Sequence, residues 1–303
     1  MTSSIKLVFF GTGHVSLDCL DGIGDVFTIE AIITKPDHVS PHGRITPPAV
    51  KVWGEDHGVP VLQLANKAEL AEFFADHQFA SQLGLVVDYG LIIPQSVLDA
   101  FELGLVNSHF SLLPAWRGAD PITAAVLAGD EVTGVTIQRV VYALDEGPIL
   151  AQESYKMPPN ITTPALTEEL TKISNRLLIR VLPEYVSGQI KPKAQDPDLV
   201  PSLSHKLTKA DGEIDWTKSA NQLEREIRAY SGWPGSYTKL ADTDVTITTA
   251  HVLTEPGKPG DVTISPTGEL TVHCGQDALI IDKLKPAGKR EMTAKEFLAG
   301  NPL

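Results

Sequence analysis

The chain has 303 residues, of which 42% are hydrophobic and 21% charged, and its formal net charge is −13. This composition is that of an ordinary globular protein, and the length exceeds the usual size of one domain, so we expect two. No apolar stretch is long enough to cross a membrane and no signal peptide is recognisable, which predicts a cytoplasmic protein. Cys19 and Cys274 lack the spacing of a metal site or a redox pair.

The net charge argues at first against a polyanionic partner, because nucleic-acid affinity rests mainly on neutralised phosphates. Residues 1–200 hold 13 Lys and Arg against 24 Asp and Glu, whereas residues 201–303 hold 12 against 14. The second part is therefore nearly neutral and can still present a basic face. Its cationic residues near the end, Lys283, Lys285, Lys289 and Arg290, fit such a face or an ordinary solvated surface equally well.

Along the first part, strand-like apolar runs alternate with segments of helical periodicity. Strands are expected at residues 6–11, 29–34, 60–64, 83–90, 103–107 and 134–141, and helices at 15–20, 94–101, 121–127 and 167–185. This alternation predicts an α/β fold with a doubly wound, mostly parallel sheet of the Rossmann type. Such a sheet binds ligands beyond the carboxyl ends of its strands, where Gly11, Tyr89 and Asn107 fall.

The loop from Gly11 to Ser16, Gly-Thr-Gly-His-Val-Ser, resembles the start of a dinucleotide-binding fingerprint. It lacks the third glycine, and Asp37 follows a proline instead of ending a second strand. We therefore expect no nicotinamide cofactor.

Three polar residues are predicted to meet at one edge of this sheet. Asn107 and His109 are two residues apart at the end of an apolar run, so in a strand they point to the same face. An amide donor beside a group that titrates near neutrality suits a reaction in which an oxyanion develops while a proton moves. Asp145, before a glycine turn, could reach the imidazole. The alternatives are a backbone-bonded histidine and an aspartate that caps its own turn.

The segment from Lys191 to Pro201 has the proline-rich character of a linker. Beyond it, a helix is expected at 220–230 and short strands at 237–239, 245–253, 260–265, 269–274 and 278–284, a spacing typical of a small β-barrel. The predicted organisation is thus a catalytic domain at 1–190, a linker at 191–203 and a small C-terminal barrel at 204–303. Trp216 and Trp233 could stack on RNA, but we favour core positions for both.

Several motifs along the chain together resemble the folate-dependent formyltransferases, in particular those that act on methionyl-tRNA. The resemblance lies in Asn107-Ser-His109, Ser111 to Ile122, Gly134-Val-Thr-Ile137, Leu144-Asp-Glu-Gly147, Ile214-Asp-Trp216, Ile227 to Pro234 and Pro286 to Met292. The motif formed by Asn107, His109 and Asp145 is shared by all folate formyltransferases of this type. The carboxyl-terminal motifs are narrower and resemble the small barrel that, in the methionyl-tRNA enzymes, helps to hold the acceptor arm of initiator tRNA.

The resemblance implies transfer of the formyl group of 10-formyltetrahydrofolate to the α-amino group of methionine esterified to initiator tRNA, a step of translation initiation. Asn107 and His109 would form the oxyanion site and Asp145 would assist the proton transfer, with no metal required. The folate co-substrate would lie against Ser111, Leu112, Leu113, Pro114, Asp88, Tyr89 and Gly90. Leu112 and Leu113 could equally be ordinary core residues, and Asp88 stands where the family usually has a small residue.

The resemblance also implies contacts with tRNA, for which Arg44, Lys206, Lys289 and Arg290 are the candidates. In the family, the segment at 34–48 is a mobile basic loop that enters the acceptor stem, whereas here Lys35 and Arg44 are its clear cations. Affinity for tRNA could therefore be lower or rest more on the second domain, or the segment could be a surface loop without function. We expect a monomer.

Two other functions remain open at this point. The first is a formyltransferase for an amino-sugar nucleotide or another small amine, against which the Asp-Trp, Trp-Pro and Pro-Ala-Gly-Lys motifs argue. The second is a non-catalytic module that binds folate or RNA, against which the intact set of Asn107, His109 and Asp145 argues.

Overall fold

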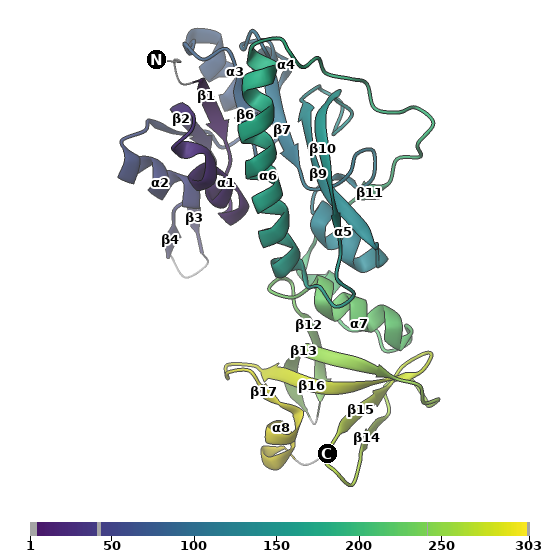
Figure 1. The fold of residues 1–303 in the computed structure, drawn as a ribbon. Helices are drawn as coiled ribbons and strands as arrows, with labels where there is room; N and C mark the ends of the chain where they lie inside the picture. Colours follow the sequence, from purple (N-terminus) through teal and green to yellow (C-terminus); the bar gives the residue numbers. More distant parts are fainter. Residues whose placement is uncertain (1–4, 41–43, 241, 302–303) are drawn as a thin grey trace. The chain divides into compact units, whose positions relative to one another are not determined.

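The computed structural model describes residues 5–40, 44–240 and 242–301 (Figure 1). The chain forms two compact units. Unit 1 comprises Met1–Pro121, Val132–Tyr155 and Thr167–Ser204, and unit 2 comprises Ile122–Glu131, Lys156–Leu166 and His205–Leu303. The boundaries expected from the sequence, at 190/191 and 203/204, stay a prediction. No helix in the described parts of the chain is long and apolar enough to cross a bilayer.

Unit 1 is built on a seven-stranded sheet with the order β10-β9-β7-β6-β1-β2-β5. Its strands are β1 (Lys6–Phe10), β2 (Thr28–Thr34), β5 (Val61–Gln63), β6 (Gly84–Val86), β7 (Leu105–His109), β9 (Val132–Arg139) and β10 (Ile149–Lys156). The ladders from β7 to β5 are parallel, whereas β9 runs antiparallel to β7. The predicted mostly parallel sheet of Rossmann type is therefore confirmed.

Short pairs of strands and several helices complete unit 1. The pairs are β3 (His38–Val39) with β4 (Ile45–Thr46), and β8 (Arg117–Gly118) with β11 (Leu203–Ser204). The helices are α1 (His14–Gly24), α2 (Ala49–His57), α3 (Lys67–Asp76), α4 (Gln95–Leu98), and the larger part of α6 (Thr163–Val186), while α5 (Pro121–Ala128) begins at its boundary with unit 2. Figure 1 shows α6 running along one face of the sheet.

The strand expected at 83–90 is shorter than predicted, and the reason lies in the backbone. β6 ends at Val86, and Asp88 and Gly90 then adopt left-handed conformations with φ of 44° and 69°. A left-handed residue turns the chain out of the extended path of a strand. This bend keeps residues 88–90 at the carboxyl end of the sheet instead of continuing the ladder.

One side of the sheet in unit 1 is filled by an aromatic core. The ring of Phe10 stacks on Phe74 at 6.2 Å and meets Tyr89 and Phe101 edge-on at 5.7 and 6.1 Å between centroids. Phe10 is fully buried, and edge-to-face pairs of this kind add to the free energy of plain area burial. The core therefore anchors β1 and the turn that follows β6.

On the side of α6, the sheet is tied to the helices by a buried chain of small polar groups. The hydroxyls of Ser108 and Ser174 are 2.7 Å apart, and Ser174 is also 3.6 Å from the thiol of Cys19. Ser108 faces α6, so its neighbours Asn107 and His109 face the other way. The alternation expected in this strand is thus fixed by a specific contact on the opposite face.

Unit 2 contains a small antiparallel sheet with the order β12-β13-β16-β15-β14, with β17 also pairing β16. Its strands are β12 (Ser236–Leu240), β13 (Thr243–Leu253), β14 (Val262–Ile264), β15 (Leu270–His273), β16 (Ala278–Pro286) and β17 (Met292–Thr293). Shifts of register around Thr249 mark bulges, which bend a strand. The small β domain expected from the spacing of strands is confirmed as a curled sheet.

The helices of unit 2 are α7 (Ala220–Ala229), α8 (Ala294–Gly300) and the 3₁₀ turn at Lys209–Gly212. Ser219 caps α7 as its side chain accepts the amide of Gln222, and Leu223 and Ile227 of α7 join the core of the sheet. Trp216 packs against this core and donates to the Thr238 hydroxyl at 3.2 Å. The prediction for Trp233 is wrong, because its side chain is 55% exposed.

The exposure of Trp233 has a local cause. It stands in a turn after α7, between Gly232 and Gly235, which both have left-handed conformations with φ of 87° and 77°.

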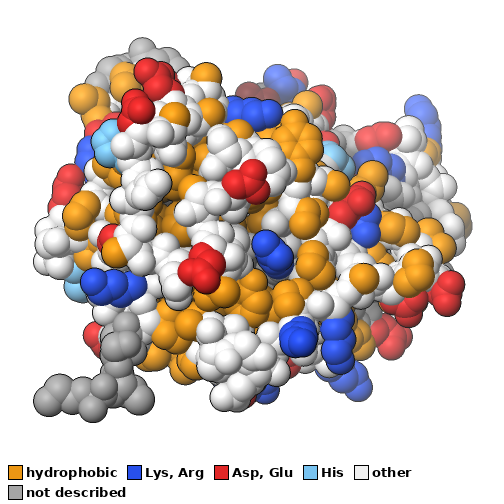
Figure 2. Space-filling model, turned by 90° about the horizontal axis from the view of Figure 1, so that it is seen from above, with side chains coloured by type: hydrophobic (Ala, Val, Ile, Leu, Met, Phe, Trp, Pro, Cys, Tyr) orange, Lys and Arg blue, Asp and Glu red, His pale blue; other side chains and the backbone are white. Residues whose placement is uncertain are grey.

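On the face of the molecule that Figure 2 shows, acidic and basic side chains are interspersed with hydrophobic ones. The net charge of −13 does not form a single acidic patch on that face.

We expect Phe10→Ala to lower the free energy of unfolding by about 3–5 kcal/mol, because it removes a fully buried ring and leaves a cavity among three aromatic partners. Urea unfolding followed by fluorescence measures the change. Val39→Ala, at a position that is 59% exposed, is the control and should stay within about 0.5 kcal/mol. A loss below about 1 kcal/mol for Phe10→Ala would show that this core is not close-packed.

Candidate active site

The candidate site is built on β7, which lies between a parallel neighbour, β6, and an antiparallel one, β9. Asn107 is in register with Val86 of β6 and with Gln138 of β9, and His109 is in register with Thr136. Residues directly opposite in an antiparallel pair project from the same face. The two predicted residues therefore share their face with the side chains of Gln138 and Thr136.

Asn107 is half-buried, and no hydrogen bond within the described residues occupies its side-chain amide. A polar group in such a position is ready to donate to a ligand. The amide predicted from the sequence to stabilise an oxyanion is thus available for that role.

His109 is held at both ring nitrogens. Nε2 donates to the backbone carbonyl of Trp116 at 3.0 Å, which assigns a proton to Nε2, and Nδ1 lies 3.6 Å from Oδ1 of Asp145. Burial lowers the pKa of His109 below its ordinary value, whereas the Asp145 carboxylate and the Trp116 carbonyl raise it. A proton arriving at Nδ1 would find the carboxylate opposite, so the site can hold an imidazolium transiently although burial favours the neutral ring.

Asp145 is fixed by two donors. Its Oδ1 accepts from Nε2 of Gln138 at 2.9 Å and its Oδ2 accepts from the backbone N–H of Gly118 at 2.8 Å. These bonds hold the carboxyl group in one orientation, with Oδ1 facing the imidazole. The structure therefore brings together Asn107, His109 and Asp145, as predicted from the sequence.

Gln138 is a site residue that the sequence analysis missed. It is 2% exposed, and its Oε1 is buried with no hydrogen-bond partner in the part of the chain that the structure describes. A glutamine within a strand carries no motif of its own. The register of β9 against β7 is the signal that finds it, because it stands opposite Asn107.

The loop predicted to contact folate is braced from inside. The hydroxyl of Thr136 donates to the Ser111 carbonyl at 2.6 Å and accepts the backbone N–H of Leu113 at 3.0 Å. Gln152 of β10 donates to the Leu113 carbonyl and to the Thr136 hydroxyl, both at 2.9 Å. The peptide bond between Leu113 and Pro114 is cis. The hydrogen bonds from Thr136 and Gln152 hold the loop in this conformation.

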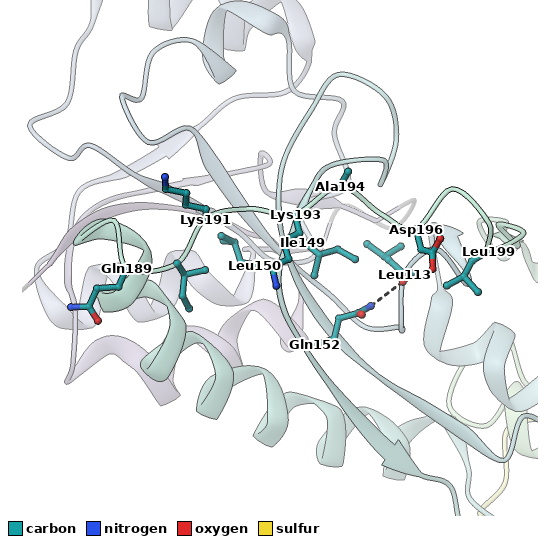
Figure 3. Close-up of a pocket in the computed structure, with 11 residues that line it drawn as sticks. Leu113, Ile149, Leu150, Gln152, Gln189, Lys191, Lys193, Ala194, Asp196 and Leu199 are labelled. Carbon is teal, nitrogen blue, oxygen red and sulfur yellow. Dashed lines mark hydrogen bonds between the residues drawn. The ribbon is translucent and has the colours of Figure 1, made fainter.

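The two leucines of this loop differ in their surroundings. Leu113 is 3% exposed, whereas Leu112 is half-buried. Leu113 also lines a cavity of about 500 Å³, whose other walls are Ile149, Leu150, Gln152, Gln189, Ile190, Lys191, Lys193, Ala194, Asp196 and Leu199. Figure 3 shows this lining, with the bond from Gln152 to Leu113 drawn as a dashed line. Leu112, being less buried, is the better placed of the two to meet a ligand.

The residues predicted to contact folate after β6 are placed differently from one another. Tyr89 is 2% exposed and its ring lies in the aromatic core, so its backbone is what remains for a ligand, and its carbonyl accepts from the Thr12 hydroxyl at 3.2 Å. Gly90 faces Lys35, since a Cβ atom added to it would lie 2.6 Å from Nζ. Asp88 lies beside Gly13, since a Cβ atom added to Gly13 would lie 2.7 Å from Oδ2 of Asp88.

Asp88 has an unusual electrostatic environment. Its side chain is accessible to solvent, yet protein surrounds it on most sides, and this desolvation together with the charge of Asp120 raises its pKa from 3.8 to about 6, against the opposing effect of Lys35. Asp88 therefore changes its charge near neutral pH at the edge of the site.

The four residues predicted to contact tRNA, Arg44, Lys206, Lys289 and Arg290, are all exposed. Arg44 belongs to unit 1 and the other three to unit 2.

No group of three His, Cys, Asp or Glu side chains that could hold a metal ion occurs within residues 5–40, 44–240 and 242–301.

Asp88→Asn should stabilise the protein above pH 6, because the folded chain binds a proton at Asp88 more tightly than the unfolded chain does. The charged carboxylate costs stability at pH 8, and this cost disappears as the pH falls through 6 toward 4. We expect the substitution to raise the Tm at pH 8 by about 2–4 °C, equivalent to about 1 kcal/mol after screening by solvent. The gain should shrink by pH 5.

Calorimetry at pH 5 and pH 8 measures this change, with the exposed Asp76 of α3 as the matched control, Asp76→Asn. A Tm that is unchanged or lower at pH 8 would contradict the environment assigned to Asp88.

Comparison with known proteins identifies the family. The formyl transferase family model matches residues 19–182, and the model of the formyl transferase C-terminal domain matches residues 206–302. The methionyl-tRNA formyltransferase of Chloroflexus aggregans is 38% identical over 98% of this chain and 97% of its own length, and that of Methylococcus capsulatus is 38% identical over 99% and 98%.

Solved structures share the fold at lower identity. The N-formyltransferase of Helicobacter canadensis, in complex with folinic acid and dTDP-3-aminofucose, has a TM-score of 0.66 at 15% identity and covers 95% of this chain and all of its own, 100%. HypX of Aquifex aeolicus, in complex with tetrahydrofolic acid, has a TM-score of 0.65 at 17% identity, and this chain spans about half of it, 47%. The chain therefore belongs to the formyl transferase family, with methionyl-tRNA formyltransferases as its relatives along almost its whole length.

Proposed function

We propose that this protein transfers the formyl group of 10-formyltetrahydrofolate to the α-amino group of methionine carried by initiator tRNA. The observation that carries the proposal is the constellation on β7. The unoccupied amide of Asn107 lies beside a buried His109 that is bonded to the Trp116 carbonyl and faces the Asp145 carboxylate. The names of the curated relatives, which match this chain from end to end, support the choice of substrate.

The reaction consists of three events, each of which the protein can assist. An amine attacks the formyl carbon, the carbonyl oxygen gains negative charge, and a proton moves from the attacking nitrogen to the departing one. Asn107 donates its amide N–H to the developing oxyanion. Both ring nitrogens of His109 face protein oxygens, the Trp116 carbonyl and Oδ1 of Asp145, so we assign the oxyanion to Asn107.

In this scheme the proton that the attacking amine loses passes to Nδ1 of His109, beside Asp145, and from there to the departing folate nitrogen. The neutral ring keeps its proton on Nε2, toward Trp116, and leaves Nδ1 as the basic atom facing Asp145. Positive charge on the ring is stabilised by the Asp145 carboxylate, which Gln138 and Gly118 hold in place by hydrogen bonds. The folate co-substrate would supply the formyl group and lie along Ser111 to Pro114, a loop that Thr136 and Gln152 keep in one conformation.

We propose further that unit 2 contributes Lys206, Lys289 and Arg290 to tRNA binding, with Arg44 of unit 1 contributing separately. All four are exposed cations, which is what contact with phosphates requires. The protein acts as a cytoplasmic monomer in this account.

The acceptor is tested by incubating the purified protein with 10-formyltetrahydrofolate and one acceptor at a time: methionine-charged initiator tRNA, free methionine, or a dTDP-amino sugar. We expect formylated product on the charged tRNA, and little or none on the other two. Product on the sugar alone would contradict the tRNA assignment and favour the small-amine alternative. Absence of product on every acceptor would favour a binding module.

His109→Ala and Asp145→Asn should each lower kcat by about 100-fold or more, because each removes one half of the proton-handling pair. Single-turnover formation of formyl-methionyl-tRNA measures the loss, with circular dichroism to verify the fold.

The matched control is His251→Ala in unit 2, where another histidine lies beside an aspartate, with 3.0 Å between Nδ1 and Oδ2 of Asp282, but on an exposed surface. It should leave kcat within about twofold of the parent. A folded Asp145→Asn variant with full activity would refute the role given to the pair.

The double variant Lys289→Ala/Arg290→Ala should raise KM for charged tRNA by about fivefold to tenfold and leave kcat nearly unchanged, since contacts with phosphates contribute to binding and not to the chemical step. The salt dependence of KM should weaken as well. Lys258→Ala, an exposed lysine in the same unit, is the control. An unchanged KM would remove these two residues from the tRNA contact.

A further inference from the structure

The segment that the sequence predicts as a linker lies against the catalytic loops. We call residues 193–204 the clasp. At its start, Lys193 pairs through its backbone with Ile149, with N···O distances of 2.6 and 2.9 Å. At its end, Leu203 and Ser204 form β11, which pairs with Arg117 and Gly118 of β8. Figure 3 shows the first half of the clasp passing over Leu113 and β10.

Gln195 is the centre of the clasp. Its Nε2 donates to the backbone carbonyl of Asp145 at 2.7 Å and to that of Gly147 at 3.0 Å, and its Oε1 accepts from Arg117 at 2.8 Å. Arg117 is also paired with Glu146 at 3.0 Å. One side chain therefore ties the loop that carries Asp145 to the loop that carries Arg117.

Arg117 stands between the two backbone groups that contact the catalytic pair. The carbonyl of Trp116 accepts from His109, and the N–H of Gly118 donates to Asp145. The clasp holds both neighbours as well, since the Ser202 hydroxyl accepts the N–H of Trp116 at 2.8 Å and the Ser202 carbonyl accepts the N–H of Arg117 at 2.9 Å. Both residues that face His109, Trp116 and Asp145, thus donate a hydrogen bond to the clasp or accept one from it.

Trp116 and Asp145 have backbone conformations that require stabilisation by their surroundings. Trp116 and Asp145 both have left-handed conformations, with φ of 57° and 51°. Residues other than glycine adopt this region at a cost, and they keep it only where the surroundings impose it. Gln195 and Ser202 bond directly to these two residues and thereby help to hold these conformations.

We propose that Gln195 is a positioning residue for the transfer reaction, and that the clasp is part of the active site instead of a passive connection between domains. The inference rests on the proposed function for its kinetic consequences but not for its geometry. Gln195 touches neither substrate nor the reacting atoms, and it acts by keeping the Asp145 carboxylate aimed at His109. Since catalysis depends on placement to within a fraction of an ångström, loosening this loop lowers turnover.

Three variants test the proposal. Gln195→Ala removes both the Nε2 donor and the Oε1 acceptor. Gln195→Glu can still accept from Arg117 but cannot donate to the Asp145 and Gly147 carbonyls. Gln189→Ala is the matched control, because Gln189 is an exposed glutamine just before the clasp, whose side chain makes no hydrogen bond with the described residues.

The kinetic readout separates positioning from substrate binding. We expect Gln195→Ala and Gln195→Glu to lower kcat for charged tRNA by about 10-fold to 100-fold, with KM changed by less than about threefold. The limb of the kcat–pH profile that reports His109 should move to lower pH, since a displaced Asp145 carboxylate supports the imidazolium less. Gln189→Ala should match the parent in kcat and in pH profile.

A second readout needs no turnover. The Gly118 amide donates to Asp145, so its hydrogen exchange reports whether the two loops remain joined. We expect this amide to exchange at least 10-fold faster in Gln195→Ala than in Gln189→Ala, while amides of β1 keep their protection.

The two readouts distinguish the failure of the inference from that of the function. A parent protein that forms no formyl-methionyl-tRNA overturns the proposed function, and the exchange of Gly118 then decides on the clasp alone. Parent-like kcat, pH profile and Gly118 exchange in Gln195→Ala overturn the inference. Full activity in Gln195→Glu overturns it too, because it would show that the bonds to the Asp145 loop are not required.

Discussion

The buried contact between the imidazole of His109 and the carboxylate of Asp145 is the constraint on which the rest of the site depends. A carboxylate removed from water is tolerated only when donors replace its hydration, and Asp145 has Gln138 and the Gly118 N–H for this purpose. The imidazole in turn requires the Trp116 carbonyl. Three separate stretches of chain, at 107–118, 138–147 and 193–204, must therefore be fixed relative to one another before the site exists.

The sheet supplies the first part of this fixation and the clasp supplies the second. β7 places Asn107 and His109 on one face because Ser108 is bonded to Ser174 on the other. The register of β9 then sets Gln138 opposite Asn107, within reach of Asp145. Two segments of the site, 116–118 and 145–147, lie outside the long strands and lack the hydrogen bonds of the main sheet. Side-chain and backbone hydrogen bonds from the clasp hold these segments in place.

Much of this could be predicted from the sequence, for identifiable reasons. The alternation of side chains along a strand places Asn107 and His109 on one face. The sequence Asp-Glu-Gly marks the turn at Asp145, so local patterns predict all three residues. Gln138, Gln195 and Ser202 were missed because their roles come from register and from contacts far apart along the chain, which no motif encodes. The same limit explains Trp233, whose exposure is set by the surrounding glycine turns. A proline-rich segment predicts a linker equally well whether or not it packs against a site.

The most direct test of the account is a titration of His109 by NMR, in the parent protein and in Asp145→Asn. Because burial outweighs the carboxylate, the pKa of His109 in the parent should lie below the ordinary value of 6.5. It should fall further in Asp145→Asn, since the charge that supports the imidazolium is then gone. A His109 pKa that stays the same or rises when Asp145 is replaced would contradict the pairing on which this account rests.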